Sequence, residues 1–251
     1  MKQVKSVFIT ILTLFIAALG MPLDSDAKVP DRKVINYVAL GDSLAAGYTP
    51  VRVENGGVKL EKLRGYPEYI KERFEQSNYK VTLKNHSAPK ATTFDLGNKL
   101  TEEEVINNIA KADAITIDIG ANDLLKHLNA NDRSGLYEAS EEALENIDKI
   151  LGIINEASDA KIYVMGYYNA LWSLPIEEGT KNELISFLHL FNNGIKEVTE
   201  EKGGIFVPTY QAIAEDYKTY LPYPDIHLSQ EGYKAVAKEF WKKMTPRKFG
   251  S

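Results

Sequence analysis

Several polar side chains of this sequence are of the types that acyl transfer through a serine requires. A hydroxyl stands at Ser43, directly after an apolar run at residues 34–40, and a primary amide stands at Asn122. A carboxylate and an imidazole stand two positions apart, at Asp225 and His227. A neutral imidazole can accept the proton of a serine hydroxyl, and a carboxylate can hold that imidazole in the required tautomer. These residue types predict nucleophilic catalysis by Ser43.

Taken singly, each of these segments also has an ordinary structural explanation. Residues 41–43 are common turn residues, Asn122 is a suitable helix N-cap, and Asp225 could shape a loop. However, each segment follows a predicted strand or precedes the last predicted helix. Ligands of open α/β sheets bind beyond the carboxyl ends of the strands. The shared position favours one common site, to which residues 85–93, after the second predicted strand, also belong.

Apolar runs of strand length alternate with amphipathic stretches of helical period along the chain. The predicted strands occupy residues 34–40, 80–85, 113–119, 161–166 and 205–207. The predicted helices occupy residues 66–77, 140–157, 180–202 and 229–244, and a further helix starts at 121. This alternation predicts a parallel sheet with helices on both faces. No repeat or low-complexity linker divides the sequence, so residues 28–251 are expected to form one domain.

Two connections of this predicted fold bear on the site. Ser43 is expected in a turn that joins the first strand to a following helix and holds the hydroxyl outward. Residues 49–64 are a long connection without a clear pattern, which contains two glycines and alternating charges. Such loops are either surface decoration or lids over active sites.

The first 27 residues have the features of a secretory signal peptide. Lys2 and Lys5 precede an apolar run at residues 7–19, and Ser25 and Ala27 then form a small-residue cleavage pattern. An uncleaved membrane anchor is the alternative, but the run is shorter than the roughly 20 apolar residues of a spanning helix. The mature protein is therefore expected to be secreted, without a membrane span.

The composition excludes several kinds of site. The sequence contains no cysteine, which excludes disulfides, thiolate metal sites, a thiol nucleophile and a lipoprotein anchor. Its four histidines show no close metal-ligand spacing. The formal net charge of −5 argues against nucleic acid as a partner. We therefore expect no metal, no organic cofactor and no nucleic-acid partner, and a monomer by default.

The polar segments resemble the sequence blocks of the GDSL, or SGNH, hydrolase family. GDSL at residues 41–44 is similar to the first block, GAND at 120–123 to the third, and DIH at 225–227 to the last. The resemblance extends from Val34 to about Trp241. It implies a flavodoxin-like three-layer α/β/α sandwich with a five-stranded parallel sheet, the SGNH hydrolase fold.

Matched by position, the family's functional residues fall on five residues of this sequence. The resemblance makes Ser43 the nucleophile, His227 the general base and later the acid, and Asp225 the residue that orients His227. The backbone N–H of Ser43 and the side-chain amide of Asn122 would be two oxyanion donors. The third donor of the family is the backbone N–H of a glycine, and Lys90 stands there in this sequence. A conformation open only to glycine would be strained by the lysine side chain.

A second departure concerns the acid. In the family it commonly lies three residues before the histidine, and that position is Pro224 here. Asp225 is preferred because a loop can bring it to the imidazole. Asp118 is a weaker candidate, expected to meet backbone groups inside the fold.

Further residues are candidates for contact with the substrate. Aromatic residues after the fourth predicted strand could wall an acyl pocket or stack on a sugar ring, although packing against the core is an equal alternative. The candidates are Asp42, Tyr167, Tyr168 and Trp172.

We therefore expect a secreted serine esterase that cleaves an acyl lipid or an O-acetylated carbohydrate. An α/β-hydrolase fits less well, because position 45 is Ala where G-x-S-x-G has glycine. The alternative from another class is a binding protein with the same fold, whose oxyanion hole is weakened by Lys90.

Overall fold

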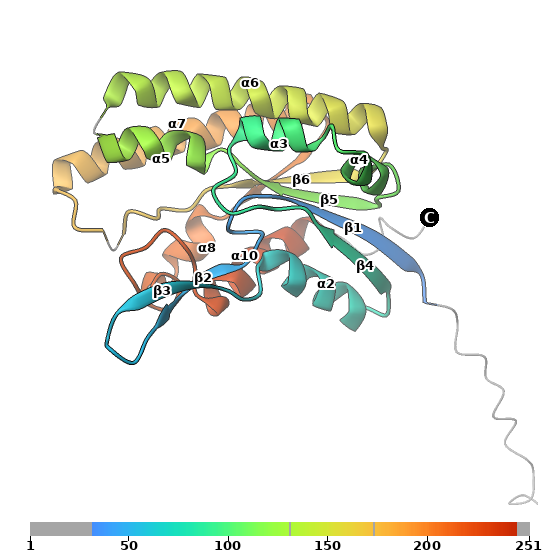
Figure 1. The fold of residues 1–251 in the computed structure, drawn as a ribbon, viewed down its shortest axis with the longest axis horizontal. Helices are drawn as coiled ribbons and strands as arrows, with labels where there is room; N and C mark the ends of the chain where they lie inside the picture. Colours follow the sequence, from blue (N-terminus) through green and yellow to red (C-terminus); the bar gives the residue numbers. More distant parts are fainter. Residues whose placement is uncertain (1–31, 131, 173, 245–251) are drawn as a thin grey trace, which may run out of the picture. The chain divides into compact units, whose positions relative to one another are not determined.

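A five-stranded parallel sheet forms the centre of the fold (Figure 1). The computed structural model describes residues 32–244 except 131 and 173, so the predicted signal peptide, residues 1–27, lies outside the described residues. The strands are β1 (Val34–Gly41), β4 (Lys80–Asn85), β5 (Ala114–Asp118), β6 (Lys161–Gly166) and β7 (Ile205–Pro208). They lie in the order β4-β1-β5-β6-β7, and every pair is parallel. Counted along the chain, this is the order 2-1-3-4-5 of a flavodoxin-like sheet.

The burial of the strands follows from their place in the sheet. All five residues of β5 are buried, and β1 is buried from Tyr37 onward. Such continuous apolar runs suit strands that are covered on both faces. The edge strand β4 instead alternates between half-buried and exposed residues.

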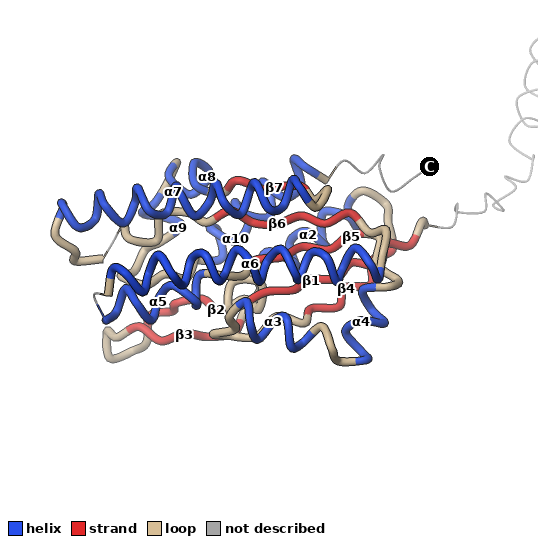
Figure 2. The backbone as a smooth tube through the Cα atoms, turned by 90° about the horizontal axis from the view of Figure 1, so that it is seen from above, coloured by secondary structure: helices blue, strands red, loops and turns tan. Residues whose placement is uncertain are grey.

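Helices cover both faces of the sheet. One layer contains α3 (Thr93–Lys99), α4 (Glu103–Ile109), α5 (Ala121–Ala130), α6 (Arg133–Ala157) and α7 (Glu178–Glu201). Figure 2, a view from above, shows that α6 and α7 run along the strands. The other layer contains α2 (Tyr66–Gln76), α8 (Tyr210–Ala214), α9 (Tyr217–Tyr220) and α10 (Gln230–Lys243). The predicted three-layer α/β/α sandwich is therefore confirmed.

Residues 49–64 do not form the patternless connection that the sequence suggested. They contain an antiparallel hairpin of β2 (Tyr48–Arg52) and β3 (Val58–Lys62). Its turn includes Asn55-Gly56, and Gly56 has a φ of 81°. Asn-Gly pairs are common in tight hairpin turns because glycine readily adopts a positive φ. Gln230 of α10 anchors its base, because its Nε2 donates to Thr49 Oγ1 at 2.8 Å and to the Arg64 carbonyl at 3.0 Å.

The packing of α2 on α10 joins an early and a late segment of the described chain. The rings of Tyr66 and Phe240 stack with centroids 4.7 Å apart, and both residues are fully buried. The ring of Trp241 packs edge-on against the ring of Phe74, with centroids 5.0 Å apart. Stacked and edge-on aromatic pairs of this kind stabilise a core beyond the area that they bury.

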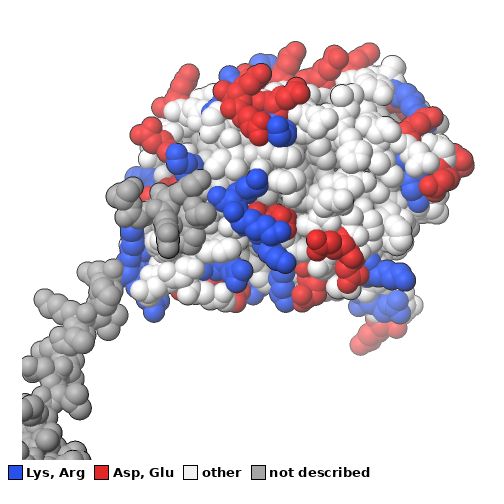
Figure 3. Space-filling view, turned by 180° about the vertical axis from the view of Figure 1, so that it is seen from behind, with Lys and Arg blue, Asp and Glu red and all other residues white. Residues whose placement is uncertain are grey.

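The surface of the described residues carries charges of both signs. Basic and acidic side chains both occur across the face shown in Figure 3, with uncharged surface between them. None of the helices in the described part of the chain combines the length and the apolar character needed to cross a membrane.

Candidate active site

Ser43 lies in a series of turns directly after β1. Asp42 opens the turn, since its Oδ1 accepts from the Leu44 N–H at 2.9 Å and its carbonyl accepts from the Ala46 N–H at 3.1 Å. The helix expected after Ser43 does not form; the chain turns over residues 42–47 and enters β2. The Tyr48 N–H donates to the Ser43 carbonyl at 2.9 Å, which closes the turn.

Ser43, His227 and Asp225 form a continuous chain of hydrogen bonds. Ser43 Oγ lies 2.8 Å from His227 Nε2, and His227 Nδ1 lies 2.6 Å from Asp225 Oδ1. The backbone N–H of His227 also donates to Asp225 Oδ1 at 2.8 Å. The structure thus places the preferred acid, and not the position of Pro224, on the imidazole. This arrangement of hydroxyl, imidazole and carboxylate can activate a serine for attack on a carbonyl.

The environment of Asp225 keeps its carboxyl ionised. Partial burial raises the pKa of Asp225, but the hydrogen bonds from the imidazole and the backbone N–H of His227 outweigh burial. The net result is a pKa below the usual value. A carboxylate that stays charged in this position stabilises the imidazolium that forms when His227 takes a proton.

The predicted oxyanion donors come from three segments of the chain. Asn122 is the second residue of α5, and its Nδ2 donates to the Ala91 carbonyl at 2.9 Å and to Asp42 Oδ2 at 3.2 Å. Lys90 has a φ of 65°, in the left-handed region that glycine prefers. Within the described residues, no hydrogen bond uses the backbone N–H of Ser43 or of Lys90.

Behind Ser43, Asp42 and Asp118 form a buried carboxyl pair. Asp118, at the end of β5, accepts from the Tyr66 hydroxyl at 2.6 Å and from the Ala45 N–H at 3.3 Å. Burial raises the pKa of Asp42 to about 6, and burial together with the nearby Asp42 raises that of Asp118 well above its usual value. The imidazole of His227 has Asp225 and not Asp118 as its partner.

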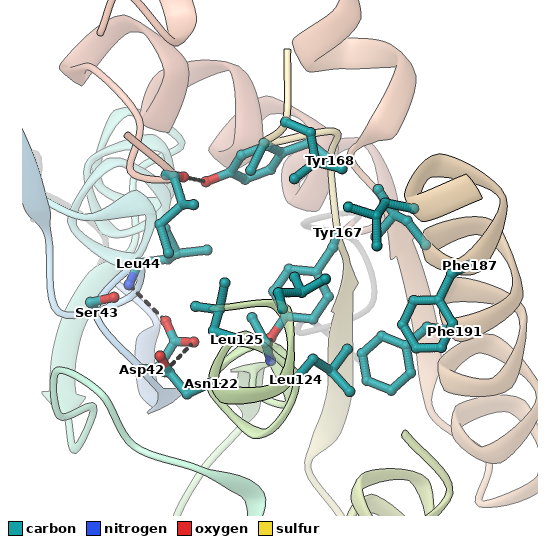
Figure 4. A pocket seen from close by; sticks show the side chains of 17 residues that line it. Asp42, Ser43, Leu44, Asn122, Leu124, Leu125, Tyr167, Tyr168, Phe187 and Phe191 are labelled. Carbon is teal, nitrogen blue, oxygen red and sulfur yellow. Dashed lines mark hydrogen bonds between the residues drawn. The ribbon is translucent and has the colours of Figure 1, made fainter. Parts of the chain in front are cut away.

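An apolar cavity of about 110 Å³ opens beside Ser43 (Figure 4). Its walls are mainly leucines of α5, aromatic residues that follow β6, and phenylalanines of α7. The principal lining residues are Leu124, Leu125, Leu128, Tyr167, Tyr168, Leu184, Phe187, Leu188 and Phe191. The sequence indicated the two tyrosines. For the lining residues of α7 the signal was the helical spacing of leucine and phenylalanine, which packing alone would also explain.

A second cavity, of about 700 Å³, borders Asp225 and His227. It shares five apolar residues with the first: Leu125, Leu128, Leu171, Leu184 and Ile226. The hydroxyl of Tyr168 donates to the Ile226 carbonyl at 2.7 Å and so connects the cavity wall to the loop of His227.

Two predicted substrate contacts are not as expected. Asp42 borders the first cavity, but it is buried and its two oxygens accept hydrogen bonds from Leu44 and Asn122. Trp172 is absent from the described linings of both cavities; it stacks on Tyr217, with ring centroids 4.9 Å apart. In the described part of the chain, no group of three or more acidic or histidine side chains could hold a metal ion.

Comparison with known proteins gives a family model and two curated relatives. The model of the GDSL-like lipase/acylhydrolase family matches residues 39–235. Spore germination lipase LipC of Bacillus licheniformis is 26% identical over 214 residues, which are 82% of this chain and 94% of LipC. The uncharacterized protein YpmR of Bacillus subtilis is 24% identical over 254 residues, covering 95% of this chain and 94% of YpmR.

Solved structures share the fold. Lipase Lip_vut3, from a goat rumen metagenome, has a TM-score of 0.70 at 24% identity, covering 86% of this chain and 99% of that one. Axe2, an acetylxylan esterase of Geobacillus stearothermophilus, has a TM-score of 0.61 at 19% identity, covering 87% and 94%.

Proposed function

The chain belongs to the GDSL-like lipase/acylhydrolase family and is a carboxylic ester hydrolase, and we propose that it acts through an acyl-enzyme on Ser43. The observation that carries this proposal is the hydrogen-bonded chain from Ser43 Oγ through His227 to Asp225, with distances of 2.8 and 2.6 Å.

The reaction follows from this geometry in two halves. His227 Nε2 takes the Ser43 proton as Oγ attacks the ester carbonyl, and Asp225 stabilises the imidazolium. His227 then gives its proton to the departing alcohol, which leaves the acyl group on Ser43. Water repeats the same steps in the second half: His227 takes a proton from water, the hydroxide oxygen attacks the acyl carbon, and Ser43 Oγ recovers its proton.

Three donors stabilise the negative oxygen of the tetrahedral intermediate in this proposal. They are the backbone N–H groups of Ser43 and Lys90 and the side-chain amide of Asn122. The two backbone groups have no protein partner within the described residues. The Asn122 amide has two hydrogens. The oxyanion would share the hydrogen that donates to Asp42, where the nitrogen–oxygen distance is 3.2 Å.

The alternative, a weakened binding protein, depended on Lys90. Its φ of 65° is in the left-handed region, which a residue with a side chain occupies at a cost of about 1–2 kcal/mol. The main chain donates the hydrogen bond, so lysine still supplies the N–H. This cost is borne by folding and does not itself argue for loss of catalysis.

The cavities support an ester with an apolar acyl chain. The lining of the cavity beside Ser43 is almost wholly apolar, which suits a chain longer than acetyl. The larger cavity beside His227 includes Arg133, Asp132 and Thr180, and it is placed where an alcohol group would leave. We propose an acyl lipid as the substrate class, and an O-acetylated carbohydrate as the second candidate because Axe2 has the same fold.

Secretion belongs to the same proposal. It is supported by Lys2, Lys5 and the apolar run at residues 7–19. A released enzyme would meet ester substrates outside the cell.

Hydrolysis of p-nitrophenyl esters from acetate to palmitate tests the proposal, with Ser43→Ala beside the wild type. We expect turnover to fall on the order of 10³-fold or more in Ser43→Ala. Ser186→Ala is the matched control, because Ser186 is exposed on α7 and bonds only to the Asn182 carbonyl. Equal turnover by wild type and Ser43→Ala would refute the acyl-enzyme. Highest turnover on the acetate ester would favour the O-acetylated carbohydrate as substrate. The same assay, applied separately to culture medium and to cells, tests secretion.

A further inference from the structure

A buried chain of polar groups extends from the core to the oxyanion donor Asn122. The Tyr66 hydroxyl donates to Asp118 Oδ1 at 2.6 Å, and Asp118 is hydrogen-bonded to Asp42. Asn122 Nδ2 then donates to Asp42 Oδ2 at 3.2 Å. Tyr66 and Asp118 are fully buried and Asp42 is 2% exposed. None of these contacts is part of the proton transfer through His227.

The partners of the two carboxyls decide which of them is ionised. Two carboxylates cannot both stay charged when they are buried in contact. Burial raises the pKa of both carboxyls, but the Leu44 N–H and the Asn122 amide donate to Asp42, whose pKa is about 6, whereas the neighbouring Asp42 raises the pKa of Asp118 further. Asp118 is therefore the carboxyl that keeps its proton and donates it to Asp42. The Tyr66 hydroxyl and the Ala45 N–H donate to Asp118 in turn.

The backbone packs closely around Asp118. A Cβ at Gly41, whose φ is 151°, would collide with Asp118 Oδ1. The Asp42 N–H donates to the Asp118 carbonyl at 3.1 Å, which joins the ends of β1 and β5. The carboxyl of Asp118 thus occupies the space beside Gly41 and is held from both sides.

We propose that Asp118, held by Tyr66, is a positioning residue of the oxyanion hole: it fixes Asp42, and Asp42 fixes the side-chain amide of Asn122. The inference rests on the proposed function, because it assigns Asn122 to the oxyanion. Without the proton of Asp118, the buried Asp42 carboxylate loses one of its three hydrogen-bond donors. It then changes its orientation to reach other donors. Asn122 then keeps only its bond to the Ala91 carbonyl to set its orientation.

Two substitutions at Asp118 separate positioning from packing. Asp118→Asn keeps the shape; its amide donates to Asp42 and its oxygen accepts from Tyr66, and only the 3.3 Å bond from the Ala45 N–H is lost, so we expect kcat within about threefold of wild type. Asp118→Leu removes both bonds, and we expect kcat to fall on the order of 10- to 100-fold, less than the full loss of an oxyanion donor. KM for the same p-nitrophenyl ester should change little, because Asp118 lines neither cavity in the described structure.

A pair of buried tyrosines gives a matched test that does not alter a carboxyl. Tyr66→Phe removes the donor to Asp118, and we expect kcat to fall several-fold at unchanged KM. Tyr163→Phe is the control, because Tyr163 is equally buried and its hydroxyl has no hydrogen-bond partner among the described residues. This pair decides the proposal if Asp118→Leu does not fold.

A boronic acid that forms a tetrahedral adduct with Ser43 provides the second measurement. Its affinity should fall with kcat in Asp118→Leu and return in Asp118→Asn, because its oxygens occupy the oxyanion hole. Melting temperatures of all variants show whether a loss follows unfolding.

The outcomes distinguish failure of the proposal from failure of the proposed function. An inactive Ser43→Ala beside an Asp118→Leu or a Tyr66→Phe with wild-type kcat would overturn the positioning role alone. Equal losses in Asp118→Asn and Asp118→Leu that follow the melting temperature would also overturn it, in favour of a structural role. Wild type and Ser43→Ala that hydrolyse esters equally would overturn both.

Discussion

At the scale of single residues, the backbone of Lys90 can be tested apart from its side chain. Its N–H is the proposed donor, so Lys90→Ala and Lys90→Gly should both keep kcat for a p-nitrophenyl ester within about threefold of wild type. Asn78→Gly is the matched control, since Asn78 is the other described residue besides glycine with a positive φ, at 67°.

Two results would contradict this expectation. A tenfold loss in both Lys90 variants, with Asn78→Gly unchanged, would mean that the ammonium group takes part in catalysis. A large gain in Lys90→Gly alone would mean that the lysine impairs the oxyanion hole, as the binding-protein alternative requires.

Single residues also show what sequence can and cannot predict about the site. Ser43, Asn122 and His227 could be assigned because their types and order have a chemical meaning that does not depend on packing. The role of Asp118 could not, because its partner Tyr66 is 52 positions away and meets it only through the packing of α2 under the sheet. The aromatic run that contains Trp172 had no feature that separates a cavity wall from a surface stack.

At the scale of elements, α7 forms one wall of both cavities. Leu184 lines each of them, so Leu184→Trp should narrow the space for the acyl chain. We expect kcat/KM for long-chain p-nitrophenyl esters to fall on the order of tenfold relative to the acetate. The reason is that contacts of an acyl chain with such a pocket contribute about 1–3 kcal/mol to transition-state binding. The chain-length profile measures this ratio.

A second position on α7 controls for the size of the new side chain. Leu190 lies on the same helix and is 58% exposed, so Leu190→Trp should leave the profile unchanged. A Leu184→Trp profile equal to that of wild type would show that the acyl chain binds elsewhere.

The accuracy of each predicted element depended on how clearly its hydrophobic pattern marks it. The strands β1, β4, β5 and β6 were predicted within about one residue: β1, β5 and β6 contain distinctive buried apolar runs, and β4 alternates between half-buried and exposed residues. The hairpin was missed although Asn55-Gly56 marks its turn, since few apolar residues alternate around it. The helix α6 begins at Arg133 and not at 140, because Asp132 caps it by accepting from the Gly135 N–H. Caps depend on single hydrogen bonds that periodicity does not show.

At the scale of the whole molecule, the buried carboxyl pair makes stability depend on pH. The folded state raises the pKa of Asp42 from 3.8 to about 6, and that of Asp118 also upward, chiefly through burial. The folded protein therefore binds more protons than the unfolded chain above about pH 4. Their contribution to stability is complete below this pH and is lost as pH rises through the folded pKa values.

Asp118→Asn should make the free energy of unfolding less dependent on pH. Between pH 5 and pH 8 we expect the wild type to lose on the order of 1–3 kcal/mol more than this variant in urea titrations. Asp95→Asn is the control: the hydrogen bonds from Thr92 lower the pKa of Asp95, so it is ionised in both states across this range. Parallel curves for wild type and Asp118→Asn would show that Asp118 is not protonated in the folded state.

The hydrogen bond between Ser43 and His227 joins residues that are 184 positions apart. The hydroxyl comes from the turns after β1, and the imidazole comes from the loop before α10. A contact of such sequence separation forms late, since the entropy of closing the loop must be offset by contacts elsewhere. A chain whose synthesis has not reached residue 227, or one cut before that residue, therefore carries the proposed nucleophile without its proposed base. In the proposed mechanism ester hydrolysis needs both parts of the fold, so its appearance during synthesis would report that folding is complete.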